Sequence, residues 1–420
     1  MTTRYLLLFG LLVAALTGCR KEYEAPVPYT FSAATGAGRF STPVRQAING
    51  VYTVTDGSDV FGPQVVLKWT YIRNGADTAH HLSVYTSNVG YFDMEPQQQL
   101  GGLGVSGYWR RLQNTEIGLV QLTVNVRRNG VVSPFSGTLV TGDTLVVSGA
   151  YGNDGVLPSK KLTMTYARPL NPRSFSILAH RAGGRTSDLL PASENSVEII
   201  KMASRLGATG IEIDVRYTKD GIPILYHDNT LNLRLIQKNG LAGAIESYTY
   251  QQLTTFVRLV NGEKIPTLEE ALETVVNNTD LSFVWLDTKY VRSMTQVQSI
   301  QRTYMQRAKA AGRSLQIVIG LPSDEAVSLY RDLPEKADTP VLCELDTSIT
   351  RSINANIWAP RWTLGDQTAE VNVMKAEGLS VFVWTLDEPQ FIQEFIDRTR
   401  FDGILSNYPC VVAYYHYIQQ

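Results

Sequence analysis

Three short polar clusters interrupt apolar, strand-like sequence in the second half of this chain. In order, they are His180-Arg181, Glu212-Ile213-Asp214 and His227-Asp228. Burying an unpaired charge is costly, so charged groups at the ends of apolar strands need a chemical reason. Carboxylates attract hard cations, imidazoles carry protons and a guanidinium binds phosphate oxygens. This combination indicates metal-assisted cleavage of a phosphodiester.

The carboxylates are spaced to bind one ion. Glu212 and Asp214 lie two residues apart in a predicted strand, so both side chains point to the same face. Two carboxylates this close repel each other unless a cation lies between them, and hard oxygen ligands favour Ca²⁺ or Mg²⁺. Asp287 and Lys289 end a later strand and again share a face. We expect Asp287 to be a third ligand and Lys289 to bind phosphate.

Two histidines at strand ends suit acid-base chemistry. Imidazoles titrate near neutrality, so His180 and His227 on opposite sides of a phosphorus could serve as general base and general acid. Arg181 offers a fork of donors to phosphate oxygens. The remaining histidines have no charged company at a strand end and are expected to be structural: His80, His81 and His416.

Three further residues are candidates for the substrate cleft. Glu194 and Asn195 open a predicted helix, where we expect Asn195 to cap the helix and both residues to help order the site, with capping alone as the alternative. Trp384 ends another strand as a wall of the cleft, with packing inside the fold as the alternative.

A tight hairpin is predicted to bring His227 to the cation. Asp220-Gly221 supplies the positive φ angles of a two-residue turn. That loop length would pair Arg216 with Leu225 and Asp214 with His227, on one face of the two strands. The sequence therefore predicts His227 beside the proposed metal.

Strands and helices alternate after a stiff linker at 168–172. The apolar runs predict nine strands: 175–179, 210–215, 222–226, 283–286, 316–319, 340–343, 356–359, 381–385 and 403–405. Helical patterns lie between them, at 195–206, 267–276, 294–311, 323–331, 368–377 and 389–399. This alternation over 173–420 predicts an eight-stranded (β/α)8 barrel of the TIM type with one extra strand. The weakest of the nine strands is 356–359.

The preceding segment, 31–168, reads as an all-β accessory domain, either a sandwich or a barrel. Its predicted strands are 50–54, 64–73, 81–86, 118–127, 138–140, 144–148 and 161–166. Several aromatic residues of this domain could form a platform for a glycan, although aromatic residues in strands more often belong to a core. They are Trp69, Tyr85, Tyr91, Tyr108 and Trp109.

The first residues predict export and lipid anchoring. Arg4 precedes an apolar run, and Leu16-Thr17-Gly18-Cys19 resembles the lipobox of bacterial lipoproteins. We expect 1–18 to be a signal peptide, 19–30 a tether with lipid on Cys19, and the location to be the bacterial cell envelope, on either the periplasmic or the surface face of the outer membrane. Only Cys343 and Cys410 remain, so no disulfide framework is expected.

The overall charge excludes one class of partner. The chain of 420 residues carries 38 basic and 39 acidic residues, a formal net charge of −1. Nothing in this balance indicates binding to a nucleic acid. The expected partner is a small-molecule phosphodiester.

Taken in order, the motifs resemble those of the glycerophosphodiester phosphodiesterase family. The resemblance covers about 176–409 and none of the accessory domain. It rests on motifs in the family's order: His-Arg, Glu-Asn, Glu-x-Asp-Val, Thr-Lys-Asp-Gly, His-Asp, Pro-Thr-Leu-Glu-Glu, Trp-Thr and Asp-Gly-Ile. It implies a β/α barrel, one divalent cation held by Glu212, Asp214 and Asp287, and catalysis by His180 and His227. The implied products are glycerol 3-phosphate and an alcohol.

The chain departs from the family pattern at several points. Asp287 stands where the family usually has Glu, which puts the affinity for the ion in doubt. Asn407 stands where Asp is more usual, so an acidic partner could be missing there. The segment between Asp228 and Pro266 has no room for a large cap domain, which predicts a fairly open mouth.

Two rival functions stay open. One is an enzyme resembling phospholipase C or D, or a phosphodiesterase acting on a polyol-phosphate polymer. The other is a lipid-anchored glycan-binding module in which the barrel is weakened. The presence of both histidines and both carboxylates of the second cluster argues against the binding module.

Overall fold

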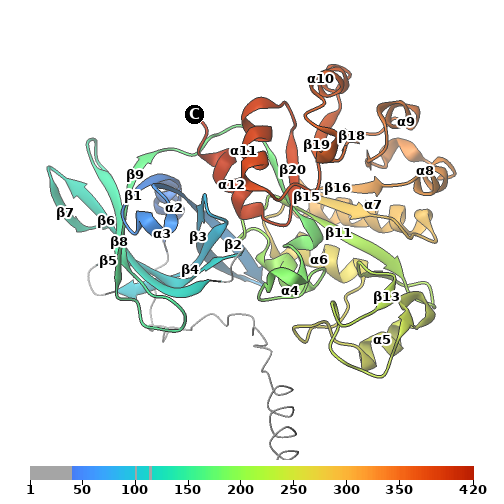
Figure 1. Cartoon of the computed structure of the whole chain (residues 1–420), viewed down its shortest axis with the longest axis horizontal. Coiled ribbons are helices and arrows are strands. Elements are labelled where there is room, and N and C mark those ends of the chain that lie inside the picture. The colour runs from blue at the N-terminus through green and yellow to red at the C-terminus, as the bar shows by residue number, and fades with distance from the viewer. Residues whose placement is uncertain (1–39, 100–101, 113–115) are drawn as a thin grey trace, which may run out of the picture.

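The computed structural model describes residues 40–99, 102–112 and 116–420 of the chain. Two barrels lie next to each other, and the last helix, α12 (Pro409–Tyr417), lies between them (Figure 1). The first barrel ends with β9 at Arg168, and the second begins with β10 at Ser176. Within the described residues, no helix combines the length and apolar character needed to cross a membrane.

The first barrel is antiparallel and runs up and down around its axis. Eight of its described strands close a ring, because β5 pairs with β6 as well as with β4. The ring consists of β1 (Gly50–Asp56), β2 (Gln64–Asn74), β3 (Asp77–Thr86), β4 (Gly90–Gln99), β5 (Gly102–Arg111), β6 (Ile117–Arg128), β8 (Thr144–Tyr151) and β9 (Lys160–Arg168). The short β7 (Val131–Pro134) extends β6 as a hairpin, and two short helices, α2 (Thr42–Ile48) and α3 (Ser58–Phe61), accompany the ring. Of the two predicted architectures, the barrel is the one formed.

Sequence patterns misjudged two parts of this barrel. No strand was predicted at β4 and β5, because glutamines, glycines and Pro96 weaken the strand signal there. The predicted strand at 138–140 is wrong, since this segment forms a loop. The segment has no partner strand, and the backbone N–H of Val140 instead donates to a side chain, the carboxylate of Asp143, at 2.9 Å.

The aromatic residues proposed as a glycan platform are all buried. Trp69 and Trp109 belong to the core of the first barrel. Tyr85, Tyr91 and Tyr108 belong to a core that is shared with the second barrel. Each of the five is less than a tenth exposed, so the platform prediction is wrong and these side chains hold the fold together.

The second barrel is a parallel β/α barrel, as predicted. In the described chain, eight strands form its ring: β10 (Ser176–Ala179), β11 (Gly210–Tyr217), β15 (Phe283–Asp287), β16 (Gln316–Leu321), β17 (Val341–Cys343), β18 (Ile357–Trp358), β19 (Ser380–Val383) and β20 (Gly403–Ser406). The ring closes because β10 pairs with both β11 and β20. The weakest predicted strand, 356–359, is the barrel strand β18. The extra strand is β12 (Pro223–Leu225), which pairs antiparallel with β11.

Helices cover the outside of the parallel ring (Figure 1). They are α4 (Val197–Met202), α6 (Leu268–Asn278), α7 (Met294–Ala310), α8 (Asp324–Arg331), α9 (Thr347–Ser352), α10 (Thr368–Ala376), α11 (Pro389–Arg398) and α12. Thr267 and Glu270 form the expected capping box of α6, and Ser323 caps α8. Helices α9 and α12 were not predicted. The second of these is apolar on nearly every side because it is buried between the barrels.

The hairpin between β11 and β12 forms, but its predicted register is wrong by one residue. Val215, not Arg216, lies opposite Leu225. The loop has three residues instead of two, because Gly221 adopts a left-handed conformation at φ 80° and its N–H bonds back to the carbonyl of Thr218. A one-residue shift reverses the faces, so Asp214 is not the ladder partner of His227.

The segment after the hairpin folds as a small lobe beside the barrel mouth. It contains β13 (Thr230–Leu231), β14 (Gly243–Ala244) and α5 (Tyr250–Phe256), seen at the lower right of Figure 1. Its apolar side chains form a core of their own, which includes Tyr226 and Leu235. The segment is too short for a large cap, yet it is an ordered lobe with its own interior.

The two barrels are joined by buried polar contacts as well as by apolar packing. Asp93 of the first barrel accepts a hydrogen bond from Arg205 at 2.8 Å and contacts His81 at 3.0 Å. The buried Arg110 donates to the backbone carbonyls of Asp188 and Leu189, which lie in the loop after β10. The first barrel therefore supports the loop that carries His180.

Candidate active site

Three carboxylates meet at the carboxyl edge of two neighbouring strands. Glu212 and Asp214 lie on β11, and Asp287 ends β15, directly opposite Asp214 in the parallel register. One oxygen from each side chain lies within 4.8 Å of the others. All three residues are buried, at 2%, 4% and 7% exposure. The convergence predicted from the sequence is therefore present.

The charges of this triad are poorly compensated by the protein. Glu212 Oε1 and Asp287 Oδ1 are buried and have no hydrogen-bond partner among the described residues. Burial and the neighbouring carboxylates raise the pKa of Glu212 well above its ordinary value, and burial also raises the pKa of Asp287. Burial opposes ionisation of Asp214 too, but His227 and Lys289 hold its pKa below the usual range. Unpaired buried oxygens in an all-carboxylate set fit a divalent cation such as Ca²⁺ or Mg²⁺.

Lys289 is the cation nearest to the triad. Its Nζ lies 2.5 Å from Asp287 Oδ2 and 3.7 Å from Asp214 Oδ1. Burial disfavours the charged ammonium, but the carboxylates of Asp287 and Asp214 outweigh burial and raise the pKa of Lys289. Lys289 therefore stays charged at the edge of the triad.

His180 is held by an amide. Its Nδ1 lies 2.8 Å from Asn407 Oδ1, and its Nε2 lies 3.8 Å from Glu212 Oε2. Asn407 donates its amide N–H to Asp387 Oδ2 at 2.6 Å. Burial lowers the pKa of His180 to about 3, which keeps the imidazole neutral near pH 7.

His227 lies on the other side of the network and has a carboxylate partner. Its Nδ1 is 2.7 Å from Asp228 Oδ1. Arg234, from the small lobe, donates to Asp228 and to Glu194 and so joins two parts of the site. The interaction of His227 with Asp214 lowers the pKa of the Asp214 carboxyl group, so His227 lies close to the triad although the predicted register is wrong.

Arg181 and Glu194 form a buried ion pair at the same edge. Arg181 Nη1 donates to Glu194 Oε1 at 2.8 Å, and its backbone N–H donates to Glu212 Oε2 at 2.8 Å. The backbone of Arg181 is left-handed, at φ 52°, which turns that N–H toward the triad. Its Nε is buried and has no partner among the described residues. This N–H remains available to an anion.

Asn195 does not cap a helix. The N-cap of α4 is Ser196, whose hydroxyl accepts from the N–H of Ile199. Asn195 instead donates to Asp214 Oδ2 at 2.8 Å and accepts from the N–H of Asp214 at 3.1 Å. The capping part of the prediction is wrong, and the predicted contact of Asn195 with the site is present.

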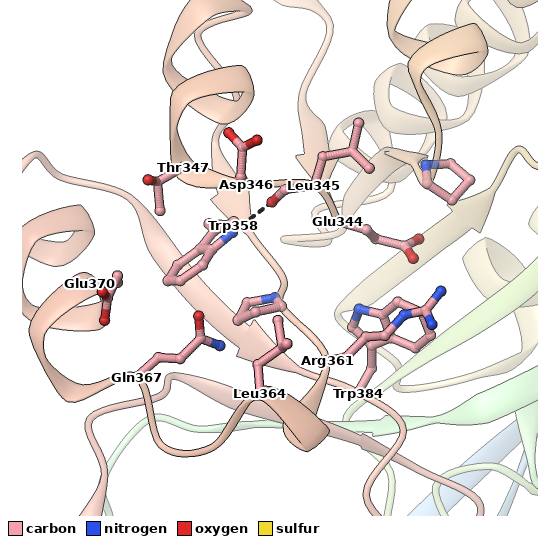
Figure 2. Close-up of a pocket in the computed structure, with 12 residues that line it drawn as sticks. Glu344, Leu345, Asp346, Thr347, Trp358, Arg361, Leu364, Gln367, Glu370 and Trp384 are labelled. Atoms are coloured by element: carbon pink, nitrogen blue, oxygen red, sulfur yellow. Dashed lines mark hydrogen bonds between the residues drawn. The ribbon is translucent and has the colours of Figure 1, made fainter.

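Trp384 directly follows β19 and lines a pocket among the loops after β17, β18 and β19 (Figure 2). Its indole N–H donates to the carbonyl of Ala359 at 2.8 Å. Its ring therefore forms a wall of this pocket.

Sequence reasoning missed several residues of the site. Asp387 and Glu344 each follow a barrel strand closely, so their position after an apolar run was an available signal. Arg234 gave no such signal, because it lies in a loop of the small lobe and reaches the site only through the fold. In the sequence, Asn407 stands out only as a departure from the family pattern, and its contact with His180 comes from the fold.

Together, the fold and the site define a parallel β/α-barrel protein with a buried carboxylate triad and two histidines at the carboxyl edge of its strands. The family model described as "Glycerophosphoryl diester phosphodiesterase family" matches residues 180–411. The chain belongs to this family. The match includes every candidate site residue named above and leaves out the first barrel.

Individual relatives are similar over shorter stretches. Glycerophosphodiester phosphodiesterase 1 of Homo sapiens is 32% identical over 155 residues, covering 35% of this chain and 43% of that protein. Glycerophosphodiester phosphodiesterase of Caldanaerobacter subterraneus subsp. tengcongensis is 33% identical over 105 residues, covering 24% of this chain and 40% of that protein. The matches thus span less than half the length of these two relatives.

The chain is also similar to a solved structure. It is an Oleispira antarctica phosphodiesterase in complex with the product sn-glycerol-3-phosphate, with 19% sequence identity and a TM-score of 0.44. The match covers 56% of this chain and 94% of that one.

Proposed function

We propose that this protein hydrolyses glycerophosphodiesters, the deacylated forms of phospholipids, to glycerol 3-phosphate and an alcohol. The observation that carries the proposal is the buried triad of Glu212, Asp214 and Asp287, in which two oxygens have no partner in the described part of the chain and two histidines stand nearby. Membership of the phosphodiesterase family supports the same reaction.

In this proposal the triad would hold one divalent cation, Ca²⁺ or Mg²⁺. Such a cation, when bound, offsets negative charge on the phosphoryl oxygens. Asp287 is shorter than the Glu usual in the family, but it lies opposite Asp214 on the adjacent strand and its oxygen reaches the common centre. The shorter side chain is therefore compatible with the proposed site.

Two cationic side chains would bind the phosphate. The Nε–H of Arg181 has no partner in the ranges that the structure describes, and its guanidinium is fixed by Glu194. Lys289 is held at the edge of the triad by Asp287. Donors fixed before the substrate arrives stabilise the developing charge without reorganisation.

The two histidines would divide the proton transfers. Because Nδ1 of His180 faces an amide oxygen, the imidazole proton is on Nδ1. Nε2 then has a free lone pair that could accept a proton from the nucleophile. His227 is oriented by the carboxylate of Asp228, which contacts its Nδ1 and leaves Nε2 as the atom that would donate a proton to the leaving alkoxide. The nucleophile is either water or a neighbouring hydroxyl of the substrate.

The test is an assay of the full-length protein with glycerophosphoethanolamine and a divalent cation. We expect release of glycerol 3-phosphate, loss of turnover with chelator, and recovery when Ca²⁺ or Mg²⁺ is added back. His180→Ala and His227→Ala should each lower kcat by roughly 100-fold or more while circular dichroism stays unchanged. Full activity in both variants would remove the histidines from the chemistry.

A second candidate, hydrolysis of intact phospholipid, is favoured by exposed apolar side chains on loops near the mouth. Leu233 is 70% exposed in the small lobe, Tyr290 is 48% exposed after β15, and Leu364 is 65% exposed after β18. Such side chains could touch a lipid surface. Turnover of phospholipid vesicles at a higher rate than turnover of soluble diesters would favour this candidate.

We also propose that the chain is anchored through lipid on Cys19 at the bacterial envelope. The lipobox-like sequence supports this, and Cys19 lies outside the described residues. Metabolic labelling with a radioactive fatty acid should label the protein, and Cys19→Ala should abolish the label.

A further inference from the structure

A pocket opens among the loops that follow β17, β18 and β19 (Figure 2). Its volume is about 410 Å³, which is in the range of small-molecule sites. Apolar walls come from Trp358, Pro360, Leu364 and Trp384. Apart from Trp384 as a wall and the exposed Leu364 as a candidate lipid contact, none of the residue roles proposed above uses this space.

Glu344 links the pocket to the reaction centre. It lines the pocket directly after β17. Its carboxyl group interacts electrostatically with Asp287, Asp214 and Lys289, which are the residues of the triad and its neighbouring cation. A molecule with its phosphate at the triad could therefore extend one of its two alcohol portions into the pocket.

The polar groups of the pocket are suited to hydroxyl groups. Gln367 lines it, and the Nε2 of this amide is buried without a partner among the described residues. Figure 2 shows the amide nitrogen of Gln367 turned toward the middle of the pocket, across from Glu344 and Arg361. The backbone of Gln367 is left-handed, at φ 42°, an uncommon conformation for a residue of this type. A carboxyl group, an amide and a guanidinium around one space can donate to and accept from several hydroxyls.

The same pocket is poorly suited to a quaternary ammonium group. Such a group binds over open aromatic faces. The ring of Trp384 already carries the guanidinium of Arg361, 4.9 Å from its centre, so this face is occupied. Trp358 is only 3% exposed, and its indole N–H is used by the carbonyl of Leu345. No lining aromatic ring among the described residues is open to a cation.

We propose that this pocket binds the head-group alcohol of the diester and selects a polyhydroxylated ring, such as a cyclitol or a sugar, over choline. The inference rests on the proposed phosphodiesterase function and adds the class of substrate. Gln367 would hydrogen-bond a ring hydroxyl, and Arg361 would keep a quaternary ammonium group off the ring of Trp384.

The experiment compares glycerophosphoinositol with glycerophosphocholine, using full-length protein. In turnover, we expect kcat/KM to favour the inositol diester by roughly tenfold or more. Gln367→Leu should lower kcat/KM for the inositol diester roughly tenfold more than for the choline diester, because it leaves a hydroxyl unpaired. Arg361→Gln should improve the choline diester relative to the inositol diester. The matched control is Gln390→Leu, an exposed glutamine on α11, which should change neither value.

Calorimetric binding of the same two diesters, with chelator present, separates this inference from the proposed function. Tighter binding of glycerophosphoinositol that is lost in Gln367→Leu would support the pocket assignment. If neither diester were hydrolysed in that case, the result would count against the proposed function and not against the pocket. Equal or tighter binding of glycerophosphocholine would overturn the pocket assignment, as would an equal effect of Gln367→Leu on both diesters, even if both were hydrolysed.

Discussion

Asn407 fixes the orientation of His180 through a single hydrogen bond of 2.8 Å between Asn407 Oδ1 and His180 Nδ1. The amide itself cannot turn over freely, because its N–H donates to Asp387 Oδ2 at 2.6 Å and the backbone N–H of Asn407 donates to Asp387 Oδ1 at 2.8 Å. Asp387 therefore supplies an acidic group near His180, but it reaches His180 through Asn407, whereas in the family pattern the acidic residue stands at position 407 itself. The amide oxygen can only accept, so the imidazole proton is on Nδ1.

The first prediction follows from this relay. Asp387→Ala should release the Asn407 amide and lower kcat by roughly 10- to 100-fold, with a smaller change in KM, because the orientation of His180 is lost and phosphate binding is not. Asp387→Asn combined with Asn407→Asp should recover much of kcat, since a carboxylate at 407 can accept from His180 and an amide at 387 can donate to it. Failure of this exchange to exceed Asp387→Ala would show that the relay does not act through the position of His180.

The second prediction concerns the triad. Glu212→Gln should raise the melting temperature of the cation-free protein, because it removes one of three buried carboxylates that repel one another. In the unsubstituted protein, Ca²⁺ or Mg²⁺ at 100 times its Kd should stabilise the fold by about 2.7 kcal/mol. Differential scanning fluorimetry with chelator and with added cation measures both effects. The idea fails if the variant still shows the full cation-induced shift.

The third prediction concerns the contact between the barrels. Arg110→Met should destabilise the protein by roughly 1–3 kcal/mol, since the buried carbonyls of Asp188 and Leu189 would lose their donor. It should also lower kcat, because those carbonyls belong to the loop that continues from His180 and Arg181. Denaturant unfolding and steady-state kinetics measure the two effects. The control is Arg128→Met, an exposed arginine paired with Asp143 on the far side of the first barrel, which should leave kcat unchanged.

The fourth prediction concerns acid stability. His416 is buried against Phe175, and burial lowers its pKa to about 4 from an ordinary value of 6.5. Between pH 6.5 and 4 the unfolded chain binds the proton and the native protein does not, so the contribution of His416 is complete above pH 6.5 and is lost as the pH falls. This group can account for at most about 3 kcal/mol. His416→Phe should flatten the fall in melting temperature between pH 7 and pH 4.5, and an unchanged pH profile would count against the assignment. His180 shifts in the same direction, so part of the slope should remain in the variant.

The sequence was a good guide wherever periodicity was strong. The alternation of apolar runs and amphipathic helices predicted the parallel barrel, and the spacing of Glu212 and Asp214 predicted a shared face. It was a poor guide to β4 and β5, where glycine and glutamine carry little strand signal and the strands form because their neighbours supply hydrogen bonds. The two-residue strand β18 shows the same effect, since ring closure holds it in place.

Loop geometry was harder to foresee. One additional residue in the turn at Gly221 changed the register of the hairpin, and the sequence of that turn is compatible with either loop length. His227 approaches Asp214 because the chain leaves the ladder after Leu225, where the alternation of faces no longer applies. Asn195 looked like a helix cap because its type suits one, and only the fold shows that Ser196 takes that role.

The sequence alone names the carboxylates, imidazoles and cations that end the strands of the second barrel, and it indicates the family to which that barrel is similar. Local patterns suffice for this because side-chain type and strand periodicity depend on near neighbours. Only the fold shows which residues hold the site residues in place. Asp387 binds Asn407, and Arg234 binds both Asp228 and Glu194. Arg110 donates to the loop after β10. These contacts join residues far apart in the chain, and their distances are set by ring closure and by the packing of one barrel against the other.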